Sequence, residues 1–419
     1  MTHDDVLVIG GGPAGASTAF ALARAGIAVH VIDRARFPRP KPCAEYLSPE
    51  ASRVLAEMGA LPRIELSGAA ALAGVHVRAP NGAVIRGDFA ASHGFSGYRD
   101  RGLSVRREVL DAILLDCARE AGGRVSEGMR VTDIVRDAHG RISGVRTLGP
   151  DGAGELGARL VIGADGLRSI VARRAGLAHT LRWPRRLALV THYAGVRDVG
   201  EHGEMHVERD GYVGIADVGN GLTTVALVVP ASRSREIAGN RAAYLEAWLA
   251  ARPHLAPRFA GATRASPVVA TGPFASHARR AWAPGLALVG DAADFFDPFT
   301  GEGIYAALRG GELLAGAVRR ALAASDVQAE SDALGAYDAA RRAEFGGKWI
   351  IERIIGAVVG TAPLINRAAR NLSRRKDLAD LLIGVTGDFV PAREVIRLGY
   401  LWRVFGRSRP AAASRVPLA

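Results

Sequence analysis

The stretch DDVLVIGGGPAGASTAFALARAGIAVHVIDRAR, residues 4–36, decides the fold. An apolar run over residues 6–9 predicts a buried strand, and residues 14–25 predict a helix rich in alanine. A second apolar run over residues 28–32 predicts another strand. The order of strand, glycine turn, helix and strand begins a βαβ unit, so we expect a parallel sheet of the Rossmann type.

The glycines between the first strand and the helix have the spacing GxGxxG. Gly10 permits a tight turn, Gly12 leaves room for a pyrophosphate, and Gly15 lets the helix pack closely on the strand. The phosphates would then meet the free N–H groups at the helix N-terminus, and an acid at the end of the second strand would bind a ribose hydroxyl. The predicted dinucleotide-binding residues here are Gly10, Gly12, Pro13, Ala14, Gly15, Asp33 and Arg34.

Two later strands also end in an aspartate beside a glycine. Residues 158–177 contain an apolar strand, an Asp-Gly turn and a short helix, and residues 285–318 contain a strand, a glycine-rich loop and a long helix. Aspartate and glycine favour turns in any case, but ligands of open α/β sheets bind at such strand ends. Three such strand ends along the chain point to one binding site. The residues singled out are Asp165, Gly166, Gly290, Asp291, Pro298, Gly301 and Gly303.

The composition narrows the class of protein. A chain of 419 residues that is 48% hydrophobic, with a mean hydropathy of +0.10, predicts a globular protein of two or three subdomains. Its two cysteines, Cys43 and Cys117, give no disulfide framework, and the N-terminus has no signal-peptide pattern. We therefore expect a cytoplasmic protein.

The net charge of +12 does not indicate a nucleic-acid partner. Residues 345–419 hold 13 Lys/Arg and 5 Asp/Glu, and no aromatic-rich RNA motif or recognition-helix pattern accompanies this surplus. We expect solvated arginines on C-terminal helices. The apolar run 354–365 has 12 residues, too few to span a bilayer, so these helices would pack over a substrate cavity or contact a membrane peripherally.

Together the three strand-end motifs resemble the FAD-binding fold shared by aromatic hydroxylases of the para-hydroxybenzoate hydroxylase type, flavin-dependent halogenases and the geranylgeranyl reductase family. The resemblance covers roughly residues 4–345. It implies an α/β fold with a glutathione-reductase-like Rossmann domain and one FAD, whose pyrophosphate lies at the glycine turn. It also implies that Asp33 binds the adenosine ribose, that Asp291 binds the ribityl chain, and that residues 298–303 cradle the isoalloxazine ring.

Three further stretches match this group of families. In SVRREVLDAILLDCA (104–118), the resemblance implies that Arg107 contacts FAD, and in GMRVTDI (128–134), that the backbone near Val131 meets the adenine. The Asp165-Gly166 turn matches a motif that in the hydroxylases serves both FAD and the pyridine nucleotide.

The segment RARFPRPKPCAEYLSPEA, residues 34–51, cannot be helical because proline occupies three alternate positions. It resembles the geranylgeranyl reductase segment in which Lys-Pro-Cys precedes two glycines and runs beside the flavin. The resemblance implies that Lys41, Cys43 and Glu45 line the site, and Lys41 and Cys43 are the candidate catalytic residues. The alternative is a rigid turn with an inert buried cysteine. Ala44 and Glu45 replace the two glycines.

A second difference from the geranylgeranyl reductase family concerns the residues expected to contact the substrate. Lipid-saturating geranylgeranyl reductases carry Tyr-x-Trp-x-Phe-Pro, whereas GYVGIADVGNGLTTVALVVP (211–230) keeps Tyr212 and has Gly214, Ala216 and Asp217 instead. The Trp-x-Trp-x-Ile-Pro stretch of halogenases is absent from the sequence. The loss of large aromatic residues favours a compact hydrophobic substrate over a long isoprenoid.

The sequence also predicts how the chain is divided into domains. A hairpin around Asn81-Gly82 should join an antiparallel substrate sheet inserted into the FAD domain. The expected parts are 1–71, 101–179 and 273–345 for FAD binding, 72–100 for the hairpin, 180–272 for the substrate domain and 346–419 for the basic C-terminal helices.

These observations predict an FAD-dependent oxidoreductase without a metal site. The favoured reaction is monooxygenation, a hydroxylation or epoxidation through a flavin hydroperoxide, with NAD(P)H as reductant and a hydrophobic small molecule of secondary or lipid metabolism as substrate. The alternative is an ene-reductase of the geranylgeranyl reductase type. A flavin-binding regulator without turnover ranks last, because it would not need the intact glycine loop.

Overall fold

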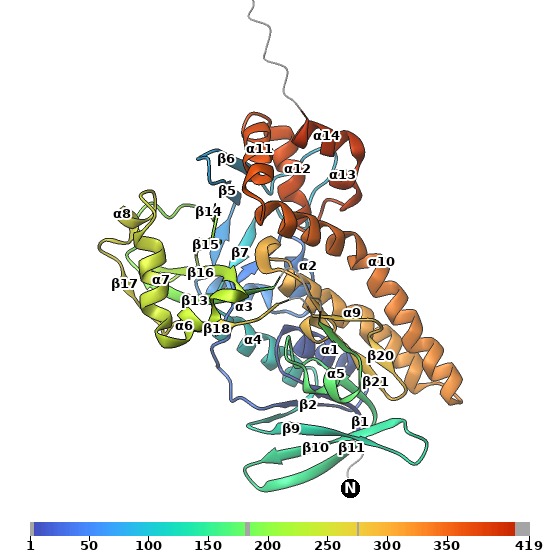
Figure 1. Ribbon diagram of the computed structural model, residues 1–419. Helices are drawn as coiled ribbons and strands as arrows, with labels where there is room; N and C mark the ends of the chain where they lie inside the picture. The colour runs from blue at the N-terminus through green and yellow to red at the C-terminus, as the bar shows by residue number, and fades with distance from the viewer. Residues whose placement is uncertain (1–3, 181–184, 275, 407–419) are drawn as a thin grey trace, which may run out of the picture.

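A parallel sheet forms one half of the molecule in the computed structural model, which describes residues 4–180, 185–274 and 276–406 (Figure 1). β10 (Ile142–Gly149) and β9 (Arg130–Arg136) extend it as an antiparallel ribbon from the first half of β11. Across the sheet the remaining strands are β20 (Trp282–Ala283), β21 (Leu286–Leu288), β11 (Gly152–Gly163), β1 (Asp4–Ile9), β2 (Val29–Asp33) and β8 (Arg124–Glu127).

The first βαβ unit forms as its sequence predicts. β1 is followed by α1 (Pro13–Arg24) and then by β2, which pairs with β1 in parallel and ends at Asp33. The glycine turn is tight: Gly10 has a φ of +109°, and a Cβ on Gly15 would lie 1.8 Å from the carbonyl oxygen of Gly10. Only glycine fits at Gly15, so the spacing fixes where α1 begins.

Helices cover this sheet and form its core with it. α1 packs against α4 and α9, and α9 packs against α10, with apolar residues of β1, β11, α1 and α9 buried together. The helices of this half are α2 (Ala51–Glu57), α3 (Leu61–Leu66), α4 (Arg107–Glu120), α5 (Ile170–Arg174), α9 (Gly303–Leu322) and α10 (Val327–Val359).

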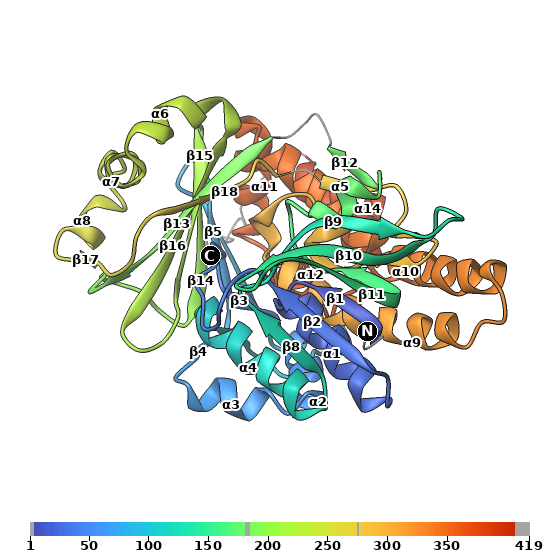
Figure 2. The ribbon, with the colours of Figure 1, turned by 90° about the horizontal axis from the view of Figure 1, so that it is seen from below.

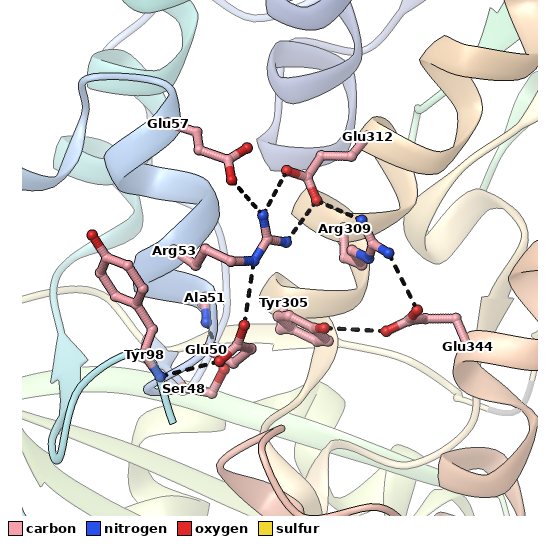
Figure 3. Close-up of polar contacts among 10 residues, drawn as sticks. All are labelled: Ser48, Glu50, Ala51, Arg53, Glu57, Tyr98, Tyr305, Arg309, Glu312 and Glu344. Carbon is pink, nitrogen blue, oxygen red and sulfur yellow. Dashed lines mark hydrogen bonds and ion pairs between the residues drawn. The ribbon is translucent and has the colours of Figure 1, made fainter. Parts of the chain in front are cut away.

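An ion-pair network fixes α2 to α9 (Figure 3). Arg53 on α2 donates hydrogen bonds to Glu57 at 2.7 Å and to Glu312 on α9 at 2.8 Å. On the same side of α9, Tyr305 donates to Glu344 of α10 at 3.2 Å. These hydrogen bonds therefore join α9 to α2 on one side and to α10 on the other.

A second sheet carries the predicted insertion. The hairpin around Asn81-Gly82 joins it as predicted, because β5 pairs with β6 and, in parallel, with β14. Its path is β17 (Thr263–Arg264), β13 (Arg186–Ala194), β16 (Leu222–Pro230), β15 (Gly211–Asp217), β14 (His202–Glu208), β5 (Gly74–Arg78) and β6 (Val84–Asp88), and β18 (Val269–Thr271) pairs with β13.

The two faces of this sheet are covered differently. On one face, inward residues such as Leu189 and Leu227 pack against α6 (Ser234–Gly239), α7 (Arg241–Ala250) and α8 (Ala256–Phe259), which Figure 2 shows on the outer side of the sheet. The opposite face packs against the C-terminal helices and opens onto a cavity.

The C-terminal helices gather beside β5 and β6 at the top of Figure 1. They follow α10 as α11 (Ala362–Leu372), α12 (Lys376–Thr386), α13 (Arg393–Ile396) and α14 (Leu398–Phe405), and α11 and α12 contact β6. α10 runs without a break across the predicted limit at residues 345–346, and the domain limits otherwise stay predictions. Within the described residues no single helix is long and apolar enough to cross a membrane. Taken together, α10 and α11 have the length and composition of a membrane span, but they are bent by 108° relative to each other.

Short strands complete the connections between the two halves. β7 pairs with both β3 and β4, and β19 pairs with β12 and β22. Their bounds are β3 (Tyr46–Leu47), β4 (Ala70–Leu72), β7 (Gly102–Ser104), β12 (Ala178–Thr180), β19 (Ser276–Ala278) and β22 (Asp294–Phe295).

Candidate functional site

A cavity of about 290 Å³ lies where the carboxyl ends of the parallel strands meet the second sheet and the C-terminal helices. Ligands of open α/β sheets bind at this position. Glu45, predicted to line the site, lies in its wall, as do twelve of the predicted catalytic and cofactor-binding residues: Gly12, Pro13, Ala14, Lys41, Cys43, Arg107, Gly166, Gly290, Asp291, Pro298, Gly301 and Gly303.

The other six predicted residues lie outside the cavity lining, namely Gly10, Gly15, Asp33, Arg34, Val131 and Asp165. The carboxylate of Asp33 accepts hydrogen bonds at 2.8 Å from the N–H groups of Gly11 and Ala35, which hold it beside the glycine turn. Arg34 is exposed, and Val131 is buried on β9 in the core. Their contacts to a cofactor stay predictions.

Two arginines stand at the glycine turn. A Cβ on Gly12 would meet no backbone atom within 4 Å, and its neighbours would be the Nη2 atoms of Arg39 at 3.6 Å and Arg107 at 3.8 Å. Both arginines pair with the buried Asp111, Arg107 through two hydrogen bonds at 2.7 and 2.8 Å and Arg39 at 3.0 Å. Two guanidinium groups share one carboxylate, so the turn at the N-terminus of α1 has a surplus of positive charge for an anion. Sequence reasoning missed Arg39, because its loop gives no local signal for this position.

The candidate catalytic residues lie in the cavity wall with altered acidity. Burial lowers the pKa of Lys41, and the positive charge of Arg107 lowers it further, against the opposing effect of Asp291. Burial raises the pKa of Asp291, while Lys41 and Arg107 oppose the rise. Burial also raises the pKa of the Cys43 thiol, whose sulfur accepts a hydrogen bond from the N–H of Glu45 at 3.3 Å. A protonated thiol is a weak nucleophile, so Cys43 is placed to line the site more than to attack a substrate.

Glu45 has a role that the sequence does not show. Its φ is +64°, a left-handed backbone that favours the glycine of the related motif. One carboxylate oxygen accepts from the N–H of Arg107 at 2.9 Å, and the other is hydrogen-bonded to Nε2 of His192 on β13 at 2.8 Å. Nδ1 of His192 contacts the hydroxyl of Ser266 at 3.1 Å. Glu45 therefore ties the proline-rich loop to the start of α4 and to the second sheet.

Asp297 holds the glycine-rich loop against the second sheet. It accepts hydrogen bonds from the hydroxyl of Tyr212 at 2.7 Å, from the N–H of Phe299 at 3.1 Å and from the guanidinium of Arg186. Arg186 also donates to the carbonyl of Gly356 on α10 at 2.8 Å. The tyrosine that the sequence retains thus positions the loop before α9.

Glu302 is a buried acid at the start of α9. Its side chain lines the cavity, is 4% exposed, and has no hydrogen-bond partner for either carboxylate oxygen within the described part of the chain. Burial raises the pKa of Glu302 to about 8, although the ammonium of Lys348 opposes the rise. Lys348 is paired with Asp388. The raised pKa favours the protonated form of Glu302, which can give up a proton inside the cavity.

The rest of the cavity is largely apolar. Alternate residues of β13, β15 and β16 face it, so one face of the second sheet forms a wall. The Sδ of Met205 lies 3.2 Å from where a Cβ on Gly214 would be, so Met205 fills the space that a larger residue on β15 would need. The wall residues are Ala188, Val190, Gly214, Ala216, Ala226 and Val228, and the aromatic lining residues include Phe274, Phe295, Phe296, Phe299 and Trp349.

The residues present fit the FAD that the sequence resemblance implies. The turn at Gly12 is open and positively charged, as a pyrophosphate requires. A buried oxygen of Asp165, Oδ1, has no hydrogen-bond partner within the described residues, while Oδ2 accepts from the N–H of Ile170 at 2.7 Å. The glycine-rich loop and the helix N-terminus at Gly303 border the apolar part of the cavity.

Comparisons with known proteins agree with this geometry. Residues 3–346 match the family model described as an FAD binding domain. The chain is similar to digeranylgeranylglycerophospholipid reductase 2 of Methanopyrus kandleri, with 30% identity over 92% of this chain and 93% of the relative.

Two solved structures have a similar fold. Flavin-dependent brominase Bmp2 is 21% identical, with a TM-score of 0.82 over 96% of this chain and 98% of that chain. PqsL of P. aeruginosa, solved in complex with 2-aminobenzoylacetate, is 26% identical, with a TM-score of 0.69 over 90% of this chain and 99% of that chain.

Proposed function

Since the chain belongs to the FAD-binding domain family of FAD-dependent oxidoreductases, we propose that it is a monooxygenase that transfers one oxygen atom of O2 to a compact hydrophobic molecule. The observation that carries the proposal is the apolar chamber joined to the cofactor cradle, with Gly214 and Ala216 in one wall and aromatic residues in the rest. Such a chamber suits a ring-shaped substrate and excludes water from the reaction.

The residues of the chain would act as follows. Arg39, Arg107 and the turn at Gly12 hold the pyrophosphate of FAD, and Asp291 holds its ribityl chain. FAD supplies the redox chemistry when bound, with NAD(P)H as the proposed reductant. The reaction consumes substrate, O2, NAD(P)H and one proton, and yields oxygenated substrate, water and NAD(P)+. Glu302, whose raised pKa favours the protonated form and which lines the cavity, is the proposed source of that proton.

Saturation of a carbon–carbon double bond is the second candidate function. It is favoured by the 30% identity with the Methanopyrus kandleri reductase along nearly the whole of both chains. That reaction consumes the alkene, NAD(P)H and one proton, and needs no O2. Both reactions would take a proton from the same cavity wall. The consumption of O2 therefore distinguishes the monooxygenase from the reductase.

The reaction with O2 gives the first prediction. Supplied with NADPH, ¹⁸O2 and candidate aromatic, polyketide-like or prenyl compounds, the FAD-loaded protein is expected to form a product with one labelled oxygen atom, in amounts equal to the O2 consumed. Mass spectrometry of the product and an oxygen electrode check this result. A product two hydrogens heavier that forms equally well without O2 would reject the monooxygenase and establish the reductase.

FAD retention gives the second prediction. Asp291→Ala removes a carboxyl group that interacts electrostatically with Lys41 and Arg107, and is expected to weaken FAD binding by on the order of 2 kcal/mol, about thirtyfold in Kd. Fluorescence titration of the apoprotein with FAD measures this. Asp151→Ala, in an exposed turn between β10 and β11, is the control and should leave the Kd unchanged. Equal affinities for both variants would remove Asp291 from the cofactor site.

A further inference from the structure

The outer face of α14 exposes large apolar side chains. Leu398 is 86% exposed and Trp402 is 72% exposed, one helical turn apart on the same side of the helix. We call this pair the α14 face. Soluble surfaces rarely place a tryptophan and a leucine together in solvent without a partner to cover them.

The opposite side of α14 is firmly attached. Tyr400 and Val404 are buried against the C-terminal helices, and the hydroxyl of Tyr400 donates to the carbonyl of Leu378 at 3.0 Å. The side-chain amide of Asn371 on α11 donates to the carbonyl of Val404 at 2.8 Å. The helix cannot rotate to bury the α14 face without breaking these contacts, so the apolar side chains are held outward.

Exposed arginines flank the α14 face along the chain. Arg393, Arg397 and Arg403 are exposed on α13 and at the two ends of α14, and the first two share the single acid Glu394. In sequence, residues 361–419 carry eleven Lys/Arg and four Asp/Glu. Tryptophan and leucine flanked by arginines are typical of a helix that lies in the interface of an anionic bilayer.

We propose that the α14 face docks the protein on the surface of a membrane that contains anionic lipids. The apolar side chains would enter the headgroup region while the arginines pair with lipid phosphates. A second copy of the chain fits this surface less well, because a two-fold contact would bring the same arginines of both copies together. The proposal does not depend on the reaction that the enzyme catalyses.

The test is co-sedimentation of the FAD-loaded full chain with vesicles. We expect binding to phosphatidylcholine vesicles that contain about a quarter phosphatidylglycerol, little binding to pure phosphatidylcholine, and release at about 0.5 M NaCl. Leu398→Ser with Trp402→Ser should weaken binding roughly tenfold, and Arg403→Gln roughly fivefold. Leu66→Ser, at an equally exposed leucine on α3, is the matched control and should bind like the wild type.

Two outcomes would overturn the proposal. One is equal sedimentation of the double serine variant and the wild type, with FAD content and circular dichroism showing that both are folded. The other is a dimer in analytical ultracentrifugation that depends on Trp402 and is accompanied by no vesicle binding, which would assign the α14 face to a protein contact.

Discussion

Asp297→Ala is expected to destabilise the protein by about 3–5 kcal/mol, because it leaves the guanidinium of Arg186 buried without its counter-charge. The hydroxyl of Tyr212 and the N–H of Phe299 lose their acceptor in the same step. The melting temperature of the FAD-loaded protein should fall by roughly 3–6 °C. Differential scanning calorimetry measures this.

Two controls distinguish a buried charge from a general loss of packing. Asp210→Ala breaks the ion pair with Arg252 at a position where the aspartate is 39% exposed, and should cost less than about 1 kcal/mol. Asp297→Ala combined with Arg186→Met removes both charges and should recover much of the lost stability. If Asp297→Ala costs no more than Asp210→Ala, then Asp297 does not hold the loop before α9.

Glu302→Gln is expected to make the protein more stable than the wild type at pH 8, with no gain near pH 4.5. The pKa of Glu302 is raised to about 8 in the fold from an ordinary value of 4.5, so the unfolded chain ionises first as the pH increases. Wild-type stability therefore falls between about pH 4.5 and pH 8, and the loss reaches on the order of 5 kcal/mol at the upper end. Glutamine does not titrate and avoids that loss.

Urea unfolding of the FAD-loaded proteins at several values between pH 5 and pH 8 measures the effect. Glu344→Gln is the control, because Glu344 accepts hydrogen bonds from Tyr305 and Arg309 at the partly exposed side of α9. It should show no gain that grows with pH. A difference between Glu302→Gln and wild type that is constant over this range would mean that Glu302 is ionised in the fold.

The parts of the site that could be predicted from sequence are local. The spacing of Gly10, Gly12 and Gly15 predicts a turn, a phosphate site and a close helix contact within six residues, and the structure has the turn at Gly10 and the close contact at Gly15. The hairpin at Asn81-Gly82 is likewise determined by neighbouring residues. Short-range patterns of this kind depend on backbone sterics, which do not vary with the rest of the fold.

The remaining parts depend on segments that are distant in sequence. Glu45 meets His192 across 147 residues, and Arg186 meets Asp297 across 111 residues. The raised pKa of Glu302 follows from its burial without a hydrogen-bond partner in the described part of the chain, which no local pattern can report. The family resemblance predicted that Lys41, Cys43 and Glu45 line the site, but it did not predict the contact between Glu45 and His192.

The strand order of the parallel sheet also determines when this protein can fold. β11 pairs with β21 through Val161 and Leu286, so the sheet lacks a strand until the ribosome has made the whole inserted domain. At roughly 5–20 residues per second, the 122 residues between Gly163 and Leu286 take roughly 6–25 s to synthesise. The neighbouring antiparallel strands β13, β15 and β16 can pair during that interval, while the edge of β11 remains open. During synthesis, the short edge at Val161 to Gly163 is therefore the place in this sheet where pairing with another chain is expected.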